Sequence, residues 1–375
     1  MNVAILNLTG GGISGGYKKY LVRLLPLLEV RLDGGKILCA APANIPVKDW
    51  FSGLTRTEFT TCKPFSPFPG HSDAALSGKL KGFAPDLVFV PLERYFKYPG
   101  VPFVSMLVNM APMLKNYADG SITEKARQLL QLYHAKRSAQ KATHIIVTSK
   151  FVRSFLVSEW DLQAEKISVI YPGADSGEGL KPAKPVALAE KGWEKFFWTI
   201  GSLEKYRGLE DILAAMQEPG AEDVKLVICA SVRRQMKSYA DKIKADISAK
   251  GLADRIIWVS GLSEGELAWC YKNSTAYIMT SRIEAGPNTA LEALSSGAVS
   301  IAASNPPLPE FFAETVLYYP SGDGKALAAR LAEVAAWGEE KRIAVSRSAY
   351  ERSKLFTWEV AAEKTAGLFK KLAGE

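Results

Sequence analysis

The chain has 375 residues, with 47 Lys and Arg against 39 Asp and Glu, so its formal net charge is +8. Single hydrophobic cores rarely grow past roughly 250–300 residues, so this length predicts two domains. Hydrophobic residues make up 47% and charged residues 23% of the chain, which excludes disordered, collagen-like and coiled-coil classes.

The excess positive charge lies in the first half of the chain. Residues 1–175 carry 21 Lys and Arg and 13 Asp and Glu, whereas residues 176–375 carry 26 of each. This asymmetry indicates an anionic partner for the first half, such as a membrane surface, a nucleic acid or an acidic substrate. The alternative is a solvated basic face without a partner.

Nothing in the sequence indicates a membrane span or a metal site. The most apolar N-terminal stretch, residues 21–30, contains Arg23, Pro26 and Glu29, whereas a transmembrane helix needs about 20 mostly apolar residues. The start of the chain lacks the basic segment of a signal peptide. The four cysteines and three histidines show no metal-ligand spacing. We therefore expect a cytoplasmic protein with free thiols and without a metal or other cofactor.

Short apolar runs alternate with helical patterns in the first half of the chain. The predicted strands cover residues 3–6, 36–40, 86–90, 103–108 and 144–148, and the predicted helices cover residues 17–28 and 122–141. These strands are apolar without alternation, which is typical of strands buried on both faces. The order of strands and helices predicts right-handed βαβ units and a doubly wound parallel sheet.

The alternation stops at a stretch rich in Pro, Gly, Ala and Lys, and then starts again. The second set has predicted strands at 197–200, 225–230, 255–259, 276–279 and 298–302, and predicted helices at 208–217, 233–249, 264–272, 287–296, 325–337, 340–353 and 358–372. We expect an α/β protein of two Rossmann-like domains that face each other across a cleft. The expected division is an N-terminal domain at 1–175, a linker at 176–191, a second domain at 192–355 and a final helical segment at 356–375.

The first candidate motif is the glycine-rich stretch after the first strand. Residues 10–15 match the G-x-G-x-x-G pattern of dinucleotide sites, in which the backbone approaches a pyrophosphate. Such sites also need a carboxylate at the end of the second strand, and here that strand ends in Cys39-Ala40-Ala41-Pro42. A nicotinamide site is therefore disfavoured. A flexible loop over a cleft is the favoured interpretation, and a simple turn is the alternative.

The second candidate motif follows the strand at 276–279. Glu284 is expected in the loop before a helix, with Pro287 in the first turn and Glu292 about one and a half turns into it. Backbone N–H groups at the start of this helix can hold a phosphate between the two carboxylates. That arrangement suits a nucleotide sugar. The alternative is an ordinary first-turn Glu followed by one exposed helix Glu.

The third candidate motif, residues 201–208, follows the strand at 197–200 and opens a helix. A basic residue here, Lys205 or Arg207, could reach a diphosphate. The alternative is a surface loop with solvated charges.

Together these segments resemble the retaining nucleotide-sugar glycosyltransferases of the GT4 family, which have the GT-B fold. The resemblance depends most on Glu284 and Glu292, which match the E-x7-E motif in its Pro-Asn variant. Residues 10–16, 148–151, 167–175, 201–208, 259–263 and 309–310 match further landmarks, and Phe356-Thr357-Trp358 resembles the start of a last helix that returns to the N-terminal domain.

The resemblance implies roles for individual residues. Glu284 would bind hydroxyl groups of the donor sugar, Glu292 would bind the ribose, and Arg207 would stabilise the diphosphate leaving group. Further donor contacts are implied for Ser202, Lys205, Leu262, Gly286, Pro287, Asn288 and Thr289, and for Gly11, Gly12, Gly15 and Gly16 of the first loop.

Two positions depart from the family pattern. Ser202 stands where many members have Arg, and Asn109 stands where many have His. Asn109 can bind a sugar hydroxyl but cannot act as a general base. The stretch resembles an Asn-Met-x-Pro subgroup, so Asn109 is kept as a catalytic-site residue. The departures leave open a non-catalytic nucleotide-sugar-binding module or partner subunit. Another GT-B enzyme, such as an epimerase, is disfavoured by the Pro-Asn form of the motif.

The resemblance implies transfer of a hexose-type sugar from a nucleotide sugar to a glycan or lipid-linked acceptor, with retention and without a metal. No nucleic-acid motif accompanies the basic half, so we expect no nucleic-acid partner. We expect the basic half to face an anionic acceptor or the inner leaflet of the membrane, which would make this a peripheral membrane protein.

Overall fold

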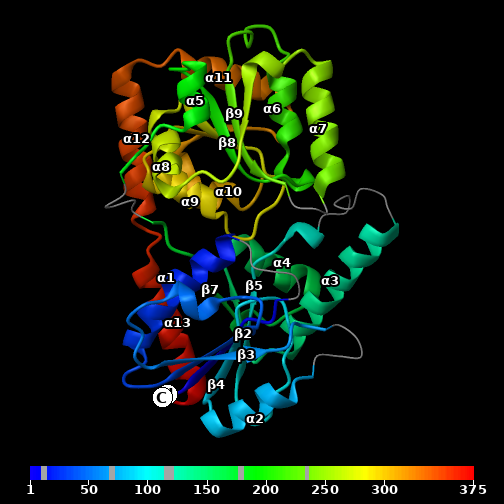
Figure 1. Cartoon of the computed structure of the whole chain (residues 1–375), viewed down its shortest axis with the longest axis vertical. Coiled ribbons are helices and arrows are strands. Elements are labelled where there is room, and N and C mark those ends of the chain that lie inside the picture. The colour runs from blue at the N-terminus through cyan, green and yellow to red at the C-terminus, as the bar shows by residue number, and fades with distance from the viewer. Residues whose placement is uncertain (10–14, 67–71, 114–121, 176–180, 233–235) are drawn as a thin grey trace. The chain divides into compact units, whose positions relative to one another are not determined.

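The structure is a computed structural model that describes residues 1–9, 15–66, 72–113, 122–175, 181–232 and 236–375. It contains two compact units (Figure 1). Unit 1 comprises Met1–Gly173 and Thr357–Glu375, and unit 2 comprises Ala174–Phe356. The stretch that we expected to be a linker includes a short helix, α5 (Val186–Lys191), with a buried Leu188.

Unit 1 is built on a seven-stranded parallel sheet with the strand order β3-β2-β1-β4-β5-β6-β7. The strands are β1 (Val3–Leu6), β2 (Ile37–Pro42), β3 (Thr57–Cys62), β4 (Leu87–Val90), β5 (Phe103–Leu107), β6 (His144–Val147) and β7 (Ile167–Val169). The helices are α1 (Gly15–Arg31), α2 (Ala74–Phe83), α3 (Ile122–Lys141), α4 (Lys150–Trp160) and α13 (Trp358–Ala373).

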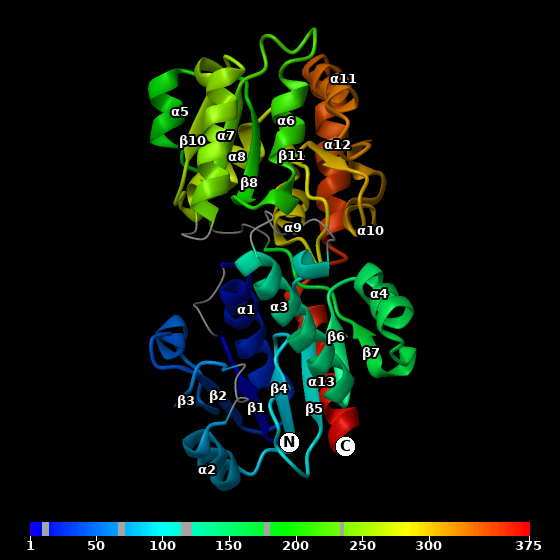
Figure 2. The same cartoon turned by 90° about the vertical axis from the view of Figure 1, so that its right-hand side faces the viewer.

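Helices cover both faces of this sheet (Figure 2). Val104 and Met106 of β5 belong to the core cluster that includes α1 and α13. Ser105 lies between them and points to the opposite face, where its hydroxyl is 2.7 Å from that of Ser138 on α3. Successive side chains of a strand alternate between faces, so α3 covers the face away from α1 and α13.

The last helix, α13, packs into the core of unit 1, which confirms the predicted return of the chain. Phe369 of α13 meets Phe89 of β4 edge to face, with ring centroids 5.2 Å apart. At the start of α13 the chain passes close to Gly173, where an added Cβ would lie 2.4 Å from the Trp358 nitrogen. Only glycine can occupy this position without moving the backbone of the last helix.

Unit 2 is built on a six-stranded parallel sheet with the order β10-β9-β8-β11-β12-β13. The strands are β8 (Phe197–Ser202), β9 (Leu226–Ser231), β10 (Ile256–Val259), β11 (Ala276–Met279), β12 (Ser300–Ala303) and β13 (Leu317–Tyr319). The helices are α5, α6 (Leu209–Ala215), α7 (Lys237–Ala249), α8 (Glu264–Asn273), α9 (Asn288–Ser295), α10 (Leu308–Phe312), α11 (Gly324–Ala335) and α12 (Glu339–Ser353). The two parallel sheets confirm the doubly wound α/β prediction for both halves.

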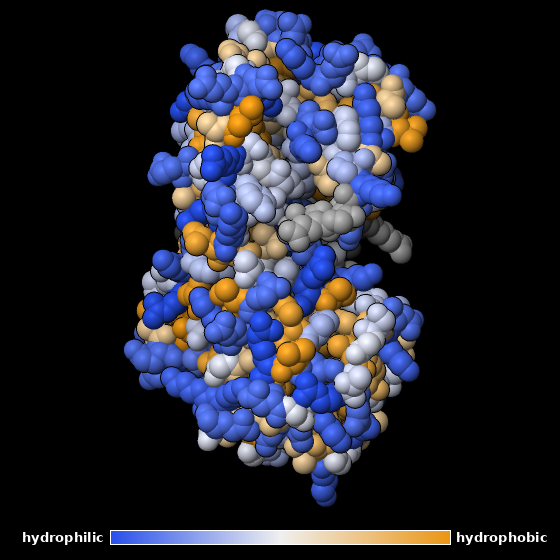
Figure 3. All heavy atoms as spheres, turned by 90° about the vertical axis from the view of Figure 1, so that its left-hand side faces the viewer, coloured by the Kyte–Doolittle hydropathy of each residue, from blue (hydrophilic) through white to orange (hydrophobic). Residues whose placement is uncertain are grey.

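The surface mixes polar and apolar residues. Figure 3 shows one face, on which apolar side chains reach the surface in small groups between hydrophilic ones. Across the described ranges, none of the helices combines the length and the apolarity that crossing a bilayer requires.

Candidate active site

The candidate site lies at the carboxyl ends of the strands of unit 2. A pocket there is lined by the ends of β8, β9 and β11 and by the segments that follow β8 and β11. In open parallel sheets, ligands bind at this edge, where loops from neighbouring strands converge. Arg207 and Ser281 both line the pocket, so two of the predicted motifs meet there.

Arg207 and Glu284 form an ion pair at this edge. The guanidinium Nη1 of Arg207 lies 2.6 Å from the Glu284 carboxylate, and the two side chains are 23% and 11% exposed. Burial alone would lower the pKa of Arg207, but the neighbouring Glu284 carboxylate raises it more, so the net shift is upward. Arg207 also stacks over Tyr206, and its Nε is buried with no hydrogen-bond partner among the described residues. Arg207 is therefore a permanently charged, partly buried cation.

Glu284 precedes helix α9 and Glu292 lies within it, as the sequence predicted. The helix begins at Asn288, and no side chain caps its N-terminus. Glu292 is half-buried in its second turn, and its carboxylate accepts a hydrogen bond of 3.2 Å from the Tyr271 hydroxyl. Burial, with the adjacent Glu292, raises the pKa of Tyr271 well above its ordinary value, so Tyr271 remains a donor. Uncapped N–H groups beside two carboxylates are chemically suited to a phosphate that carries hydroxyl-bearing groups on either side.

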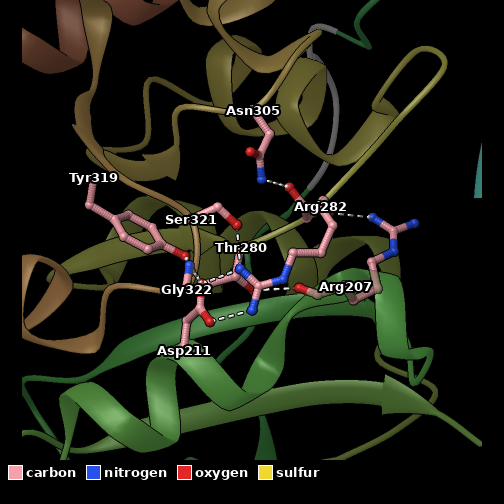
Figure 4. Close-up of polar contacts among 9 residues, drawn as sticks. Arg207, Asp211, Thr280, Arg282, Asn305, Tyr319, Ser321 and Gly322 are labelled. Carbon is pink, nitrogen blue, oxygen red and sulfur yellow. Dashed lines mark hydrogen bonds and ion pairs between the residues drawn. The ribbon is translucent and has the colours of Figure 1, made fainter. Parts of the chain in front are cut away.

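A second ion pair lies close to the first in the structure, and nothing in the sequence pointed to it. Asp211 of α6 is 3% exposed, and both of its carboxylate oxygens accept hydrogen bonds from Arg282 (Figure 4). The same carboxylate accepts bonds of 2.9 Å from the Tyr319 hydroxyl and from the Gly322 backbone N–H. Arg282 also donates to the Ser321 hydroxyl. Burial alone would lower the pKa of Arg282, but Asp211 raises it on balance.

This second pair fixes the loop that carries Glu284. The backbone N–H of Arg282 donates to the Tyr206 carbonyl at 2.7 Å, and the Thr280 hydroxyl donates to the Arg207 carbonyl. The loop after β11 is thus bonded to the turn after β8, while the two guanidinium groups of Arg207 and Arg282 point in different directions (Figure 4). Arg282 anchors the loop to the interior and leaves Arg207 to face Glu284.

Gly208 makes the close approach of these two loops feasible. Its φ is +65°, and an added Cβ would lie 2.4 Å from the Thr280 carbonyl oxygen. This left-handed conformation favours glycine, and the contact leaves no room for a side chain.

The other predicted donor residues of unit 2 lie around the same edge. Ser202 ends β8 and is half-buried, Lys205 is exposed in the turn that follows, and Leu262 is half-buried before α8. Gly286, Pro287 and Thr289 lie at the start of α9, where the Thr289 carbonyl accepts a bond of 3.3 Å from Tyr271.

The predicted residues of unit 1 lie at the carboxyl end of its own sheet. Asn109 follows β5 and is exposed, and its side-chain oxygen accepts a bond of 3.0 Å from the Ala111 N–H. Its own N–H donates to Glu93 at 2.8 Å. Gly15 and Gly16 form the first residues of α1, and Gly11 and Gly12 lie outside the described residues.

Glu93 was not singled out in the sequence. One of its carboxylate oxygens accepts hydrogen bonds from the N–H groups of both Val108 and Asn109. Burial raises the pKa of Glu93 despite these bonds and the nearby Arg94. Glu93 therefore holds the turn that presents Asn109.

The four cysteines are buried and free, and burial raises the pKa of each thiol. Within the part of the chain that the structure describes, no group of three or more His, Cys, Asp or Glu side chains could hold a metal ion.

A family model described as Glycosyl transferases group 1 matches residues 181–352. This match covers most of unit 2 and includes both ion pairs. The chain is 30% identical over 208 residues to the lipopolysaccharide core biosynthesis mannosyltransferase LpcC of Rhizobium leguminosarum bv. viciae, a match that covers 52% of this chain and 58% of that protein. The chain spans about three fifths of the length of the first two curated relatives it matches.

Solved structures resemble the whole chain. Sucrose-phosphate synthase from Thermosynechococcus elongatus superposes with a TM-score of 0.76 at 16% identity, over 99% of each chain. The Anabaena protein Alr3699/HepE, solved in complex with UDP-glucose, superposes with a TM-score of 0.69 at 15% identity, over 98% of each chain. These likenesses establish the GT-B fold.

Proposed function

We propose that this chain, which carries a group 1 glycosyltransferase domain on a GT-B fold, transfers a hexose from a nucleotide sugar to an acceptor with retention of anomeric configuration. The observation that carries the proposal is the geometry at the start of α9. There Glu284, paired with Arg207, precedes an uncapped helix N-terminus, and Glu292 follows within the helix. The UDP-glucose complex of HepE supports a nucleotide-sugar donor.

The donor diphosphate would bind the N–H groups at the start of α9. A helix N-terminus attracts anions because its N–H groups are unpaired and the helix dipole is positive there. Glu292, in the second turn, would accept hydrogen bonds from the ribose hydroxyls. Glu284, in the preceding loop, would accept them from the donor sugar, and carboxylates are strong acceptors for hydroxyl groups.

Arg207 would stabilise the leaving group. Cleavage of the glycosidic bond places negative charge on the diphosphate and positive charge on the sugar ring, as in other reactions with oxocarbenium-like transition states. Among the described residues, Nη1 of Arg207 bonds to Glu284 and to the Ser281 hydroxyl, and the N–H groups of Nη2 have no partner. These groups can stabilise the negative charge that develops on the phosphate, without a metal ion. The network around Asp211 holds the turn that carries Arg207, so the guanidinium is already in position.

Unit 1 would bind the acceptor, a glycan or a lipid-linked sugar. It carries 24 Lys and Arg against 15 Asp and Glu, whereas unit 2 carries 23 against 24. Asn109 would bind an acceptor or donor hydroxyl through its exposed amide. The positive charge would also favour peripheral contact with the anionic inner leaflet of the membrane.

The test is release of nucleotide from a panel of UDP-, GDP- and ADP-hexoses, with and without glycan acceptors, followed by NMR of the anomeric proton of the product. We expect one donor to be consumed and its anomeric configuration to be retained. Tight nucleotide binding without turnover of any donor would instead support the non-catalytic module. Inversion of configuration would contradict the retaining mechanism.

A further inference from the structure

The Glu93 side chain of unit 1 keeps one oxygen atom without a partner. Its carboxylate accepts hydrogen bonds of 2.5 and 2.8 Å from the backbone N–H groups of Val108 and Asn109, and both bonds end on Oε1. Among the described residues, the second oxygen, Oε2, has no hydrogen-bond partner, and the side chain is only half-buried. Oε2 is therefore a strong hydrogen-bond acceptor that remains available to a ligand.

The neighbouring Asn109 side chain keeps a hydrogen-bond donor without a partner. Its oxygen accepts a bond of 3.0 Å from the Ala111 N–H, which fixes the orientation of the amide. Its Nδ2 group belongs to an exposed side chain and makes no hydrogen bond with any residue that the structure describes. Because the Asn109 backbone is bonded to Glu93, one turn presents both a free acceptor and a free donor.

These two residues lie where parallel sheets bind their ligands. From β1 the chain continues to β2 and β3 on one side and returns to β4 on the other side, so the strand order reverses between β1 and β4. Glu93 follows β4, and Asn109 follows the neighbouring strand β5. Ligands of open parallel sheets bind beside such a reversal, outside the carboxyl ends of the strands.

The surroundings of Glu93 favour an uncharged ligand at this point. Tyr17 of α1 donates a bond of 2.6 Å to the Asn7 side chain just after β1. Burial raises the pKa of Tyr17 well above its ordinary value, and the Glu93 carboxylate adds to this rise, so Tyr17 stays neutral. Burial also raises the pKa of Glu93, although Arg94 lowers it in part. An ionised carboxylate repels an anionic group but accepts a bond from a neutral hydroxyl.

We propose that Glu93 Oε2 and Asn109 Nδ2 together bind an uncharged sugar hydroxyl, or two neighbouring hydroxyls, of the acceptor. This inference rests on the proposed function, and it names the residues that select the acceptor. A hydroxyl group both donates and accepts hydrogen bonds, so it needs one acceptor and one donor from the protein. An anionic group of the acceptor, which the net charge of unit 1 would attract, would bind away from Glu93.

The first test exchanges the two hydrogen-bonding roles. Glu93→Gln keeps an oxygen for the two backbone N–H groups but replaces the free acceptor atom by a donor. Asn109→Asp keeps the oxygen that bonds to Ala111 but replaces the free donor by an acceptor. With the substrates that the panel identifies, each change should raise the KM for the sugar acceptor about tenfold or more and leave the KM for the nucleotide sugar within about twofold. The double variant again has one donor and one acceptor, so its KM for the sugar acceptor should return to within about threefold of wild type.

The matched control is Glu165→Gln, which removes an exposed charge just before β7, and it should change either KM by less than about twofold. A wild-type KM for the sugar acceptor in both single variants would overturn the proposal. So would a rise in the double variant as large as the two single rises multiplied together. Asn109 is exposed, so Asn109→Asp remains informative if Glu93→Gln fails to fold.

A binding measurement separates this proposal from the proposed function. Saturation-transfer NMR with methyl α-glucoside, methyl α-mannoside and methyl α-galactoside, in the presence of UDP, requires no sugar transfer. We expect at least one glycoside to bind the wild type, to lose binding in each single variant and to recover it in the double variant. This pattern without turnover of any nucleotide sugar would support the subsite and contradict the proposed function.

Two results of this measurement would overturn the subsite even if transfer is observed. One is that none of the three glycosides binds, or that binding is unchanged in both single variants. The other is that binding is lost in Glu284→Gln, which would place the glycoside in unit 2.

Discussion

Units 1 and 2 share a fold but differ in the partners of their charged side chains. In unit 2 two of the carboxylates at the site have cationic partners, since Glu284 pairs with Arg207 and Asp211 with Arg282. In unit 1 the Glu93 carboxylate bonds to backbone N–H groups, while Arg94 and Arg137 lie over aromatic rings. Unit 2 also has near-balanced charge, with 23 Lys and Arg against 24 Asp and Glu.

The difference indicates what each unit is arranged to bind. Paired charges in unit 2 fix two loops around a helix N-terminus, so the positive potential for a phosphate comes from the backbone and from one arginine. Under the proposed function, internal bonds would hold the donor site, and the net positive charge of unit 1 would favour an anionic acceptor.

The largest expected effect comes from breaking the ion pair between Glu284 and Arg207 in unit 2. Glu284→Gln should lower kcat/KM for transfer by roughly 100-fold or more, because the amide cannot balance Arg207 or accept sugar hydroxyls as a carboxylate does. Nucleotide-release kinetics would measure it. Glu264→Gln, which alters an exposed carboxylate at the start of α8, is the matched control. A rate near wild type in Glu284→Gln would contradict the assignment.

Breaking the ion pair between Asp211 and Arg282 should reduce both the free energy of unfolding and the rate of sugar transfer. Asp211→Asn leaves Arg282 without its carboxylate, and we expect a loss of about 2–3 kcal/mol in the free energy of unfolding. Transfer should fall because the loop that carries Glu284 loses its anchor. Arg282→Lys keeps one charged bond and should lose less on both counts. Denaturant titration and donor KM would measure these effects, and unchanged kinetics in a folded Asp211→Asn would exclude a positioning role.

Gly208→Ala tests the contact between the two loops without altering charge. The left-handed φ and the Thr280 carbonyl at 2.4 Å predict a loss of about 2 kcal/mol in unfolding free energy. Because the same change displaces Arg207, donor KM should rise as well. Gly220→Ala, at φ +88° in open space, is the control for backbone strain alone. Equal behaviour of the two variants would show that the close approach has no role.

The smallest effect concerns Glu93 of unit 1. Burial raises the pKa of this carboxyl in the folded state. Its contribution to stability is therefore present below its unfolded pKa and is lost as pH rises through the raised folded value. Glu93→Gln keeps an oxygen for both N–H groups but cannot ionise, so the fall in unfolding free energy across that pH window should shrink. Denaturant titrations at several pH values would measure it, and an unchanged fall would assign it to other groups.

The sequence predicted the central strands well because they are buried on both faces and read as short apolar runs. It missed β3 and β13, which lie at sheet edges and whose residues are partly exposed. Thr57–Cys62 has no apolar run, so nothing in the sequence alone distinguished it from a loop. The helix predicted at 264–272 was correct because its start is marked locally, by the capping box of Ser263 and Glu266.

The site was predictable in part for the same reason. Glu284, Glu292 and Arg207 lie in local motifs, and the structure brings the first and last of these within 2.6 Å. Asp211 and Arg282 are 71 residues apart, and no local pattern joins them. Long-range ion pairs depend on how the strands are ordered, which the alternation of strands and helices does not specify.

The most direct test of the donor site is a comparison of two affinities in two variants. Titrations would use the nucleotide sugar selected from the panel and its nucleoside diphosphate. We predict that Glu292→Gln weakens binding of both ligands, because both contain the ribose. Glu284→Gln should weaken binding of the nucleotide sugar alone, because only this ligand carries the sugar that Glu284 contacts. Wild-type affinity for both ligands in both variants would contradict the account.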